Sequence, residues 1–221
     1  MATFVLIPGA GDSASAWDLV AGELRERGHE VVAVDLPVED KSAGLSEYAD
    51  TVTEAIGDRT ELVVVAHSLG GFTAPLVCDR LRADLLVLVA GMIPAPGETG
   101  DDWWDNTGQG EAMSAQNLDD ERDIALFLAD VPLKLAMEAL ANGRDQSETP
   151  MQEPWPLHAW PDVPTRYLLC RDDRFFPAEW LRGVVSQRLG IVADEIDGGH
   201  CPFLSRPKAL AERLVGYWDA R

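Results

Sequence analysis

The sequence is short of basic residues and contains no long hydrophobic run. Its 18 Lys and Arg side chains are outnumbered by 38 Asp and Glu, which gives a formal net charge of −20. Such a surface repels phosphate backbones and anionic lipid headgroups, so nucleic acids and membrane surfaces are not expected partners. No apolar stretch approaches the roughly 20 residues of a membrane span, and the first residues do not resemble a signal peptide.

Cysteine is also scarce. Cys78, Cys170 and Cys201 are an odd number without metal-binding spacing. This usage is typical of a reducing compartment, so we expect a cytoplasmic protein with no metal and no organic cofactor. The 221 residues, 46% of them apolar, suit a single domain spanning 1–221. The sequence does not decide between a monomer and a homodimer.

Short apolar runs alternate with amphipathic segments along most of the chain. Continuous apolar runs are typical of strands that helices cover on both faces, and the alternation predicts a mostly parallel α/β sheet. We expect about six strands flanked by helices. The strands are predicted at Phe4–Ile7, Val31–Val34, Leu62–Ala66, Leu85–Val89, Arg166–Leu169 and Ile191–Glu195, and the helices near 15–27, 46–57, 69–82, 178–189 and 206–219.

The alternation stops between residues 92 and 163, which are rich in Pro, Gly, Trp and acidic side chains. This stretch is too long for a simple connection, so we expect an inserted cap with helices near 120–130 and 133–141. A segment after the carboxyl end of a strand lies over the edge where α/β proteins bind ligands. Met92, Trp103, Trp104 and Trp155 are therefore candidates for a substrate pocket, the alternative for the tryptophans being the core of the cap itself.

One serine lies where a predicted strand turns into a predicted helix, in Ala66-His67-Ser68-Leu69-Gly70. The run matches the S-x-G core of a nucleophile elbow, in which small neighbours leave a serine accessible on a sharp turn. The Leu69 N–H, at the helix N-terminus, is placed to stabilise an oxyanion. Two alternatives stay open: Ser68 could merely cap the helix, and His67 could be the base, although neighbours in a turn point apart.

A glycine-rich loop, Pro8-Gly9-Ala10-Gly11, follows the first predicted strand. It lacks the full dinucleotide fingerprint. We interpret it as the source of a second oxyanion donor, the Ala10 N–H, with Gly9 letting the backbone pass close to the substrate. The alternative is an ordinary tight turn.

The remaining catalytic groups are expected after the last two strands. His200 lies between the last strand and the last helix and is the best candidate for a general base. Asp172 or Asp173, after the preceding strand, could hold the His200 ring in the correct tautomer. The resulting chain order of Ser, Asp and His is the order found in one particular hydrolase fold.

With these elements in place, the chain resembles the α/β-hydrolase superfamily along almost its whole length. Phe4-Val5-Leu6-Ile7-Pro8-Gly9 with Trp17 is similar to the opening of the small esterases grouped with plant methylesterases and hydroxynitrile lyases. That group has an Asp four residues before a Pro, which places the acid on Asp173, ahead of Pro177. The same match implies Ala10 and Leu69 as the oxyanion donors.

The chain departs from that group at several positions. Pro8 stands where the group has His, and Ala66 stands where the elbow consensus has Gly. The lyases of the group carry Thr in the oxyanion loop and Lys after the catalytic His, whereas this chain has Gly9 and Cys201. Cyanohydrin cleavage is therefore disfavoured.

The expected activity is carboxylesterase-like hydrolysis of small to medium, uncharged esters through an acyl-enzyme. Two alternatives on the same fold stay open: a small-molecule-binding protein with a vestigial triad, and a lyase or tailoring enzyme. A nucleotide-binding α/β protein is disfavoured because the phosphate fingerprint is absent.

Overall fold

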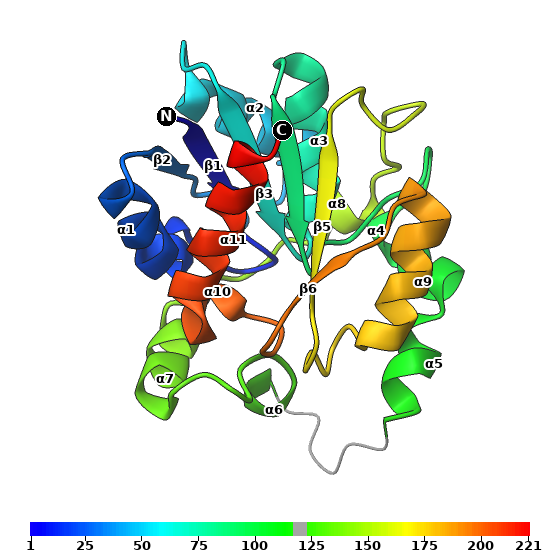
Figure 1. Cartoon of the computed structure of the whole chain (residues 1–221). Coiled ribbons are helices and arrows are strands. Elements are labelled where there is room, and N and C mark those ends of the chain that lie inside the picture. The colour runs from blue at the N-terminus through cyan, green and yellow to red at the C-terminus, as the bar shows by residue number, and fades with distance from the viewer. Residues whose placement is uncertain (117–122) are drawn as a thin grey trace.

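Six parallel strands form the centre of the computed structural model, which describes residues 1–116 and 123–221 (Figure 1). The strand order is β2-β1-β3-β4-β5-β6, and every neighbouring pair runs parallel. The predicted parallel α/β sheet is thereby confirmed. The strands are β1 (Thr3–Ile7), β2 (Glu30–Ala33), β3 (Leu62–His67), β4 (Leu85–Val89), β5 (Thr165–Cys170) and β6 (Asp194–Ile196).

Helices cover both faces of this sheet. In Figure 1, α11 crosses in front of the strands and packs against α1, whereas α2 and α3 lie together behind them. The helices of this framework are η1 (Ala14–Trp17), α1 (Asp18–Glu26), α2 (Leu45–Ile56), α3 (Gly70–Arg80), α9 (Ala178–Leu189), α10 (Pro202–Ser205) and α11 (Pro207–Asp219).

The central strands are buried along their whole length. Every residue of β1, β3 and β4 is buried, whereas the edge strand β2 is only partly covered. The apolar runs of the sequence thus match a sheet with helices on both sides. This buried frame holds the loops at the carboxyl ends of the strands in fixed positions.

The last strand differs from its predicted position at Ile191–Glu195. Strand β6 begins only at Asp194, where pairing with Leu168 of β5 starts. Helix α9 ends at Gly190 in the left-handed conformation (φ 67°), and the chain must turn back before it reaches the sheet. Val192 lies in this turn with 93% of its surface exposed. The apolar residues at the start of the predicted strand therefore do not belong to the buried sheet.

The stretch between β4 and β5 carries further helices, as expected for the cap. Helix α7 has the predicted bounds, whereas the helix expected near 120–130 is described only from Asp123, its first residues lying outside the described ranges. The cap helices within the described ranges are α4 (Gly100–Thr107), α5 (Gln109–Ser114), α6 (Asp123–Phe127), α7 (Leu133–Ala141) and α8 (Thr149–Gln152).

The cap is fastened to the sheet domain by a buried ion pair. The Arg188 guanidinium of α9 grips both carboxylate oxygens of Glu98, at 2.8 Å for Nη2 and Oε1, and also donates to the Ile93 carbonyl. Asn106 of α4 and the Ala95 N–H donate to the same carboxylate. The start of the cap is thus anchored at one charged point.

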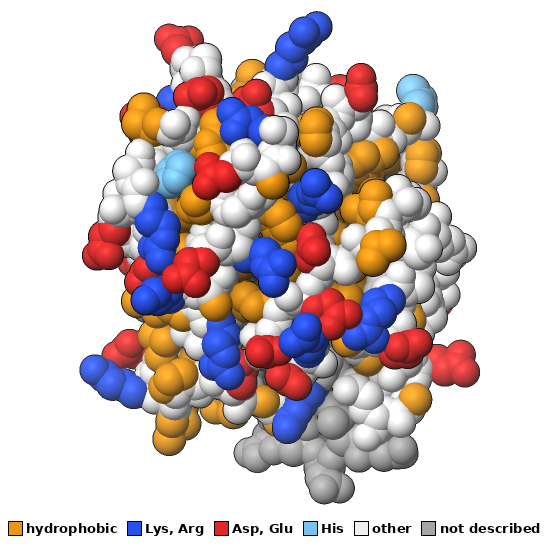
Figure 2. All heavy atoms as spheres, in the orientation of Figure 1, with side chains coloured by type: hydrophobic (Ala, Val, Ile, Leu, Met, Phe, Trp, Pro, Cys, Tyr) orange, Lys and Arg blue, Asp and Glu red, His pale blue; other side chains and the backbone are white. Residues whose placement is uncertain are grey.

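The surface drawn in Figure 2 mixes acidic and basic side chains over α9 and α11. Apolar side chains gather at its lower left over α7, where Leu133 and Met137 are exposed. Among the described residues, no helix combines the length and the apolar character needed to cross a bilayer.

Candidate active site

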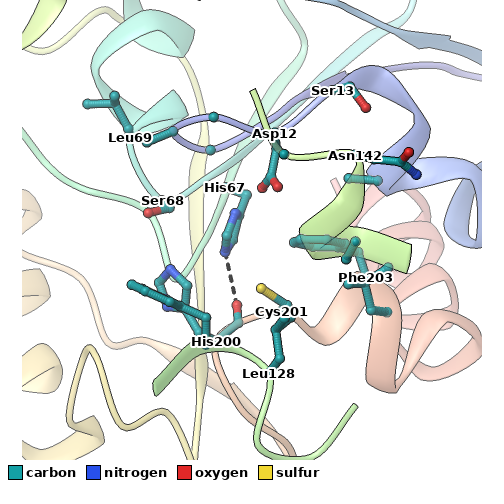
Figure 3. Close-up of a pocket in the computed structure, with 18 of the residues that line it drawn as sticks. Asp12, Ser13, His67, Ser68, Leu69, Leu128, Asn142, His200, Cys201 and Phe203 are labelled. Carbon is teal, nitrogen blue, oxygen red and sulfur yellow. Dashed lines mark hydrogen bonds between the residues drawn. The ribbon is translucent and has the colours of Figure 1, made fainter. Parts of the chain in front are cut away.

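The loops that follow β1 and β3 lie side by side, because these two strands are parallel neighbours in the sheet. Together with the loop before α10 they border a cavity of about 730 Å³ beneath the cap (Figure 3). Segments far apart in the sequence therefore meet at one edge of the sheet. Among the residues singled out from the sequence, those that line the cavity are Gly9, Ala10, Gly11, His67, Ser68, Leu69, Met92, Trp104, His200 and Cys201.

Ser68 occupies a strained turn between β3 and α3. Its φ angle is +47°, a region that side chains other than Gly and Asn rarely adopt. Its carbonyl accepts hydrogen bonds from the Gly71 N–H (3.0 Å) and the Met92 N–H (2.9 Å), which hold the turn from two sides. The Ser68 side chain is thereby kept at the cavity wall.

His200 and Asp173 are joined by a buried hydrogen bond of 2.8 Å between Nδ1 and Oδ2. The second oxygen of Asp173, Oδ1, accepts from the N–H groups of Phe175 and Phe176, both at 2.9 Å. Because a carboxylate only accepts, His200 donates from Nδ1, and in the neutral ring Nε2 is then free to accept a proton. Asp172 instead accepts from the Gly198 N–H and lies exposed.

Ser68 and His200 line the same cavity, and Figure 3 shows the serine side chain directly above the histidine ring. Within the described residues, Ser68 Oγ makes no hydrogen bond. The described structure therefore contains the hydrogen bond between Asp173 and His200 but no hydrogen bond between His200 and Ser68.

Two residues of the cavity lining have backbone N–H groups without partners. Ala10 and Leu69 line the cavity, and their N–H groups donate no hydrogen bond to any of the described residues. Leu69 precedes α3, whose N-terminal end carries partial positive charge. An anionic oxygen placed between these two groups would be stabilised by both.

The loop after β1 is held in place by the cap. The Gly11 N–H donates to Gln146 Oε1 (3.2 Å), and the Gly11 carbonyl accepts from the Arg144 N–H (2.8 Å). Gln146 in turn donates to the Tyr48 hydroxyl of α2. The cap therefore contributes to the position of the Ala10 N–H as well as to the cavity wall.

His67 packs beneath this arrangement. Its Nε2 donates to the backbone carbonyl of His200 at 2.9 Å, and the centroids of the two imidazole rings lie 4.6 Å apart. Burial, with a smaller effect of His200, holds the pKa of His67 well below its usual value, so its ring is neutral. Nδ1 finds no partner among the described residues and lies against Gly9. His67 thus supports the His200 loop with a neutral N–H.

The three candidate tryptophans occupy different environments. Trp104 lines the cavity and contacts Phe175. Trp103 is fully buried, with its indole N–H bonded to the Ile93 carbonyl, and Trp155 is 1% exposed and donates to the Phe72 carbonyl. These two side chains lie outside the cavity lining and pack the interface between the cap and the sheet domain.

Asp12 lines the cavity and was not singled out from the sequence. Burial, partly offset by the nearby His200, raises the pKa of its carboxyl to about 6. The signal that could have revealed it is its place in the loop, two residues after Ala10. Asp12 therefore adds a carboxyl group to the same cavity that Ser68, His200 and Ala10 line.

Within residues 1–116 and 123–221, no three His, Cys, Asp or Glu side chains are grouped so that they could hold a metal ion. The three cysteines are free and buried. Cys201 lines the cavity, but burial raises the pKa of its thiol well above the usual value, so it is protonated. The cavity lining therefore offers the Ser68 hydroxyl, the imidazoles of His67 and His200, and carboxylates such as that of Asp12.

A family model described as the alpha/beta hydrolase family matches residues 4–213. Among curated proteins, Methylesterase 7 of Arabidopsis thaliana is 25% identical and the match covers 98% of this chain and 96% of that protein. A pyrethroid hydrolase of Sphingobium wenxiniae is also 25% identical, with coverage of 98% and 87%.

Solved structures show the same fold. A crystal structure of polyneuridine aldehyde esterase superposes with a TM-score of 0.82 at 20% identity, covering 98% of this chain and 99% of that chain. An extracellular alpha/beta-hydrolase from a Paenibacillus species has a TM-score of 0.79 at 23% identity, with 98% of both chains covered.

Proposed function

Because the chain belongs to the alpha/beta hydrolase family, we propose that it is a serine esterase with Ser68 as nucleophile, His200 as general base and Asp173 as the acid. The observation that carries the proposal is the Asp173–His200 hydrogen bond at the cavity wall. It fixes the tautomer in which Nε2 is a proton acceptor on the side where Ser68 lies.

The reaction follows from the placement of these groups. His200 Nε2 takes the Ser68 proton while Oγ attacks the ester carbonyl, and the Ala10 and Leu69 N–H groups hold the oxyanion. His200 then protonates the leaving alcohol, which leaves an acyl-serine. In the second half His200 removes a proton from water and the hydroxide attacks the acyl group. The bond to Ser68 Oγ then breaks, His200 returns its proton to Oγ, and the carboxylic acid leaves.

The cavity favours esters of small to medium size. Its volume of about 730 Å³ lies within the range of small-molecule sites. Relatives whose names include esterase, methylesterase and pyrethroid hydrolase support ester cleavage. The cap and the sheet domain both contribute apolar side chains to the lining. Those from the cap are Met92, Trp104, Phe127, Leu128, Leu135, Ala139, Leu140 and Met151, and those from the sheet domain include Leu19, Leu69, Phe175, Phe203 and Leu204.

The test combines turnover with covalent labelling. A graded series of p-nitrophenyl esters should be hydrolysed, with a chain-length optimum set by the cavity. A fluorophosphonate probe should attach to Ser68, as mapped by mass spectrometry, and should fail to label Ser68→Ala. A folded protein that neither turns over esters nor reacts with the probe would favour the alternative of a non-catalytic binding protein. The lack of a hydrogen bond between Ser68 and His200 in the described structure is the observation that favours this alternative.

Gly9→Ala should lower kcat by about 100-fold, because small displacements of reacting groups cost this much. A Cβ at position 9 would lie 2.8 Å from His67 Nδ1 and 3.1 Å from Ser68 Cβ, so both must shift. Steady-state hydrolysis of p-nitrophenyl butanoate measures the effect. Gly22→Ala in α1 is the matched control, because its Cβ meets nothing within 4 Å. Equal activity of the two variants would contradict the proposed role of the loop.

A further inference from the structure

Asp12 presents an unpaired carboxylate to the cavity. Within the described residues, no hydrogen bond and no ion pair reaches its side chain, which is half-buried. Figure 3 shows its carboxylate pointing from the loop after β1 toward His67, on the side of the cavity where His200 and Cys201 lie. A partly desolvated carboxylate without a partner is costly, and this cost is the reason for the raised pKa of Asp12. At neutral pH and above it is nevertheless ionised.

Within the described cavity lining no side chain forms an ion pair with this carboxylate, and the nearby His200 offsets only part of the effect of burial on its pKa. The other charged groups of the lining are Asp18 and Glu138, both acidic, and Arg144. The Arg144 guanidinium is committed elsewhere: Nη1 donates to the Leu36 carbonyl at 2.9 Å. Arg144 also pairs with Asp35 and Glu39, which lie outside the lining. The cavity is therefore negative near Asp12, and a positive charge that enters it gains Coulomb energy.

Aromatic rings supply a second attraction for cations in the same cavity. Phe127 and Phe175 both line it, and each ring centroid lies 5.4 Å from that of His200. Trp104 borders Phe175 at 5.7 Å. Ring faces attract ammonium groups, and cages of aromatic rings bind quaternary ammonium ligands. The cavity that Ser68 lines thus contains both an unpaired carboxylate and aromatic rings.

We propose that Asp12 determines substrate choice and selects esters that carry an ammonium group. This inference rests on the proposed esterase function and replaces the uncharged esters expected from the sequence with cationic ones. The ammonium group occupies the space beside Asp12 while the ester carbonyl lies between the Ala10 and Leu69 N–H groups. Asp12 takes no part in proton transfer. Its role is to bind the part of the substrate that does not react.

The test uses two pairs of esters in which a trimethylammonium group is replaced by the isosteric tert-butyl group. Acetylcholine and its isostere 3,3-dimethylbutyl acetate place the group in the alcohol part of the ester. The p-nitrophenyl esters of 4-(trimethylammonio)butanoic and 5,5-dimethylhexanoic acids place it in the acyl chain. For at least one pair, the wild type should favour the cation in kcat/KM by about tenfold, as expected for a partly desolvated charge pair. Asp12→Asn should remove this preference.

The control variant is Asp50→Asn on α2. It removes the same formal charge from the surface outside the cavity lining and should keep the wild-type preference. The proposal is overturned if the wild type favours neither cation, or if Asp12→Asn keeps the wild-type ratio. Calorimetry on Ser68→Ala separates this question from catalysis. If no ester is turned over, the proposed function fails, while the relative affinities of Ser68→Ala and the Asp12→Asn double variant for each pair still decide the role of Asp12.

Discussion

Asp173→Asn is expected to lower kcat for ester hydrolysis by about four orders of magnitude, as loss of the carboxylate does in other triads. The reason is specific to the contacts of this side chain. Oδ1 accepts two backbone N–H groups, from Phe175 and Phe176, and an Asn oxygen will stay on these donors. The amide NH₂ then faces His200 Nδ1, which must become an acceptor. His200 is left protonated on Nε2 and cannot take the proton of Ser68.

Asp172→Asn is the matched control for this prediction. Asp172 is exposed and accepts from the Gly198 N–H at 3.1 Å, a bond that an Asn oxygen can also make. Its kcat should remain close to that of the wild type. Initial rates on p-nitrophenyl butanoate measure both variants, and circular dichroism establishes that they are folded. A loss in Asp172→Asn with retention in Asp173→Asn would move the acid to the neighbouring residue.

Arg188→Met should destabilise the protein by about 3 kcal/mol, the cost of breaking a buried ion pair from one side. The Glu98 side chain is only 4% exposed, and Arg188 supplies hydrogen bonds to both of its oxygens. Met keeps most of the length of the side chain but leaves the carboxylate without its cation. Urea unfolding should show a lower midpoint with an unchanged m-value.

The comparison variant is Arg182→Met on the same helix. Arg182 pairs with Glu179 and Glu195 at the surface, where water already solvates the charges, so its unfolding midpoint should barely move. Equal midpoints for Arg182→Met and Arg188→Met would show that the cap is not anchored through Glu98.

The contribution of Glu98 should also depend on pH. Burial alone would raise its pKa, but the hydrogen bonds from Arg188, the Ala95 N–H and Asn106 outweigh this and lower it below the ordinary 4.5. A carboxylate with a lowered folded-state pKa contributes stability above its unfolded pKa and loses it as the pH falls through the folded value. The difference between wild type and Arg188→Met should therefore shrink on acidification below about pH 4.5.

The sheet could be predicted because local patterns determine it, and the pairing of Asp173 with His200 could be predicted with the help of a family resemblance. Apolar runs predicted each central strand, since only strands covered on both faces tolerate them. Ser68 was predicted from small residues around a strand-to-helix turn, and its φ of +47° agrees with the sharp turn assumed for it. The choice of Asp173 over Asp172 came from a family spacing to Pro177, and in the structure Asp173 is the carboxylate that contacts His200.

Features that depend on packing between distant segments could not be predicted in this way. Trp103 and Trp104 are neighbours, yet one is fully buried and the other lines the cavity, because successive helical residues point about 100° apart. Nothing local indicates which side of α4 meets the sheet domain. The direction of Asp12 likewise depends on how the cap holds Gly11 through Gln146 and Arg144, a contact between segments more than a hundred residues apart.

The position of the cap between β4 and β5 has a consequence for how freely this chain can vary. These strands are neighbours in the sheet but are separated by about 75 residues, from Ala90 to Pro164. The entropy of closing a loop grows only logarithmically with its length, by about 0.6 kcal/mol for each doubling. Lengthening or shortening the segment therefore costs the sheet little. Insertions and deletions in this segment can therefore change the residues that line the cavity, while the strands that position Ser68 and His200 stay unchanged.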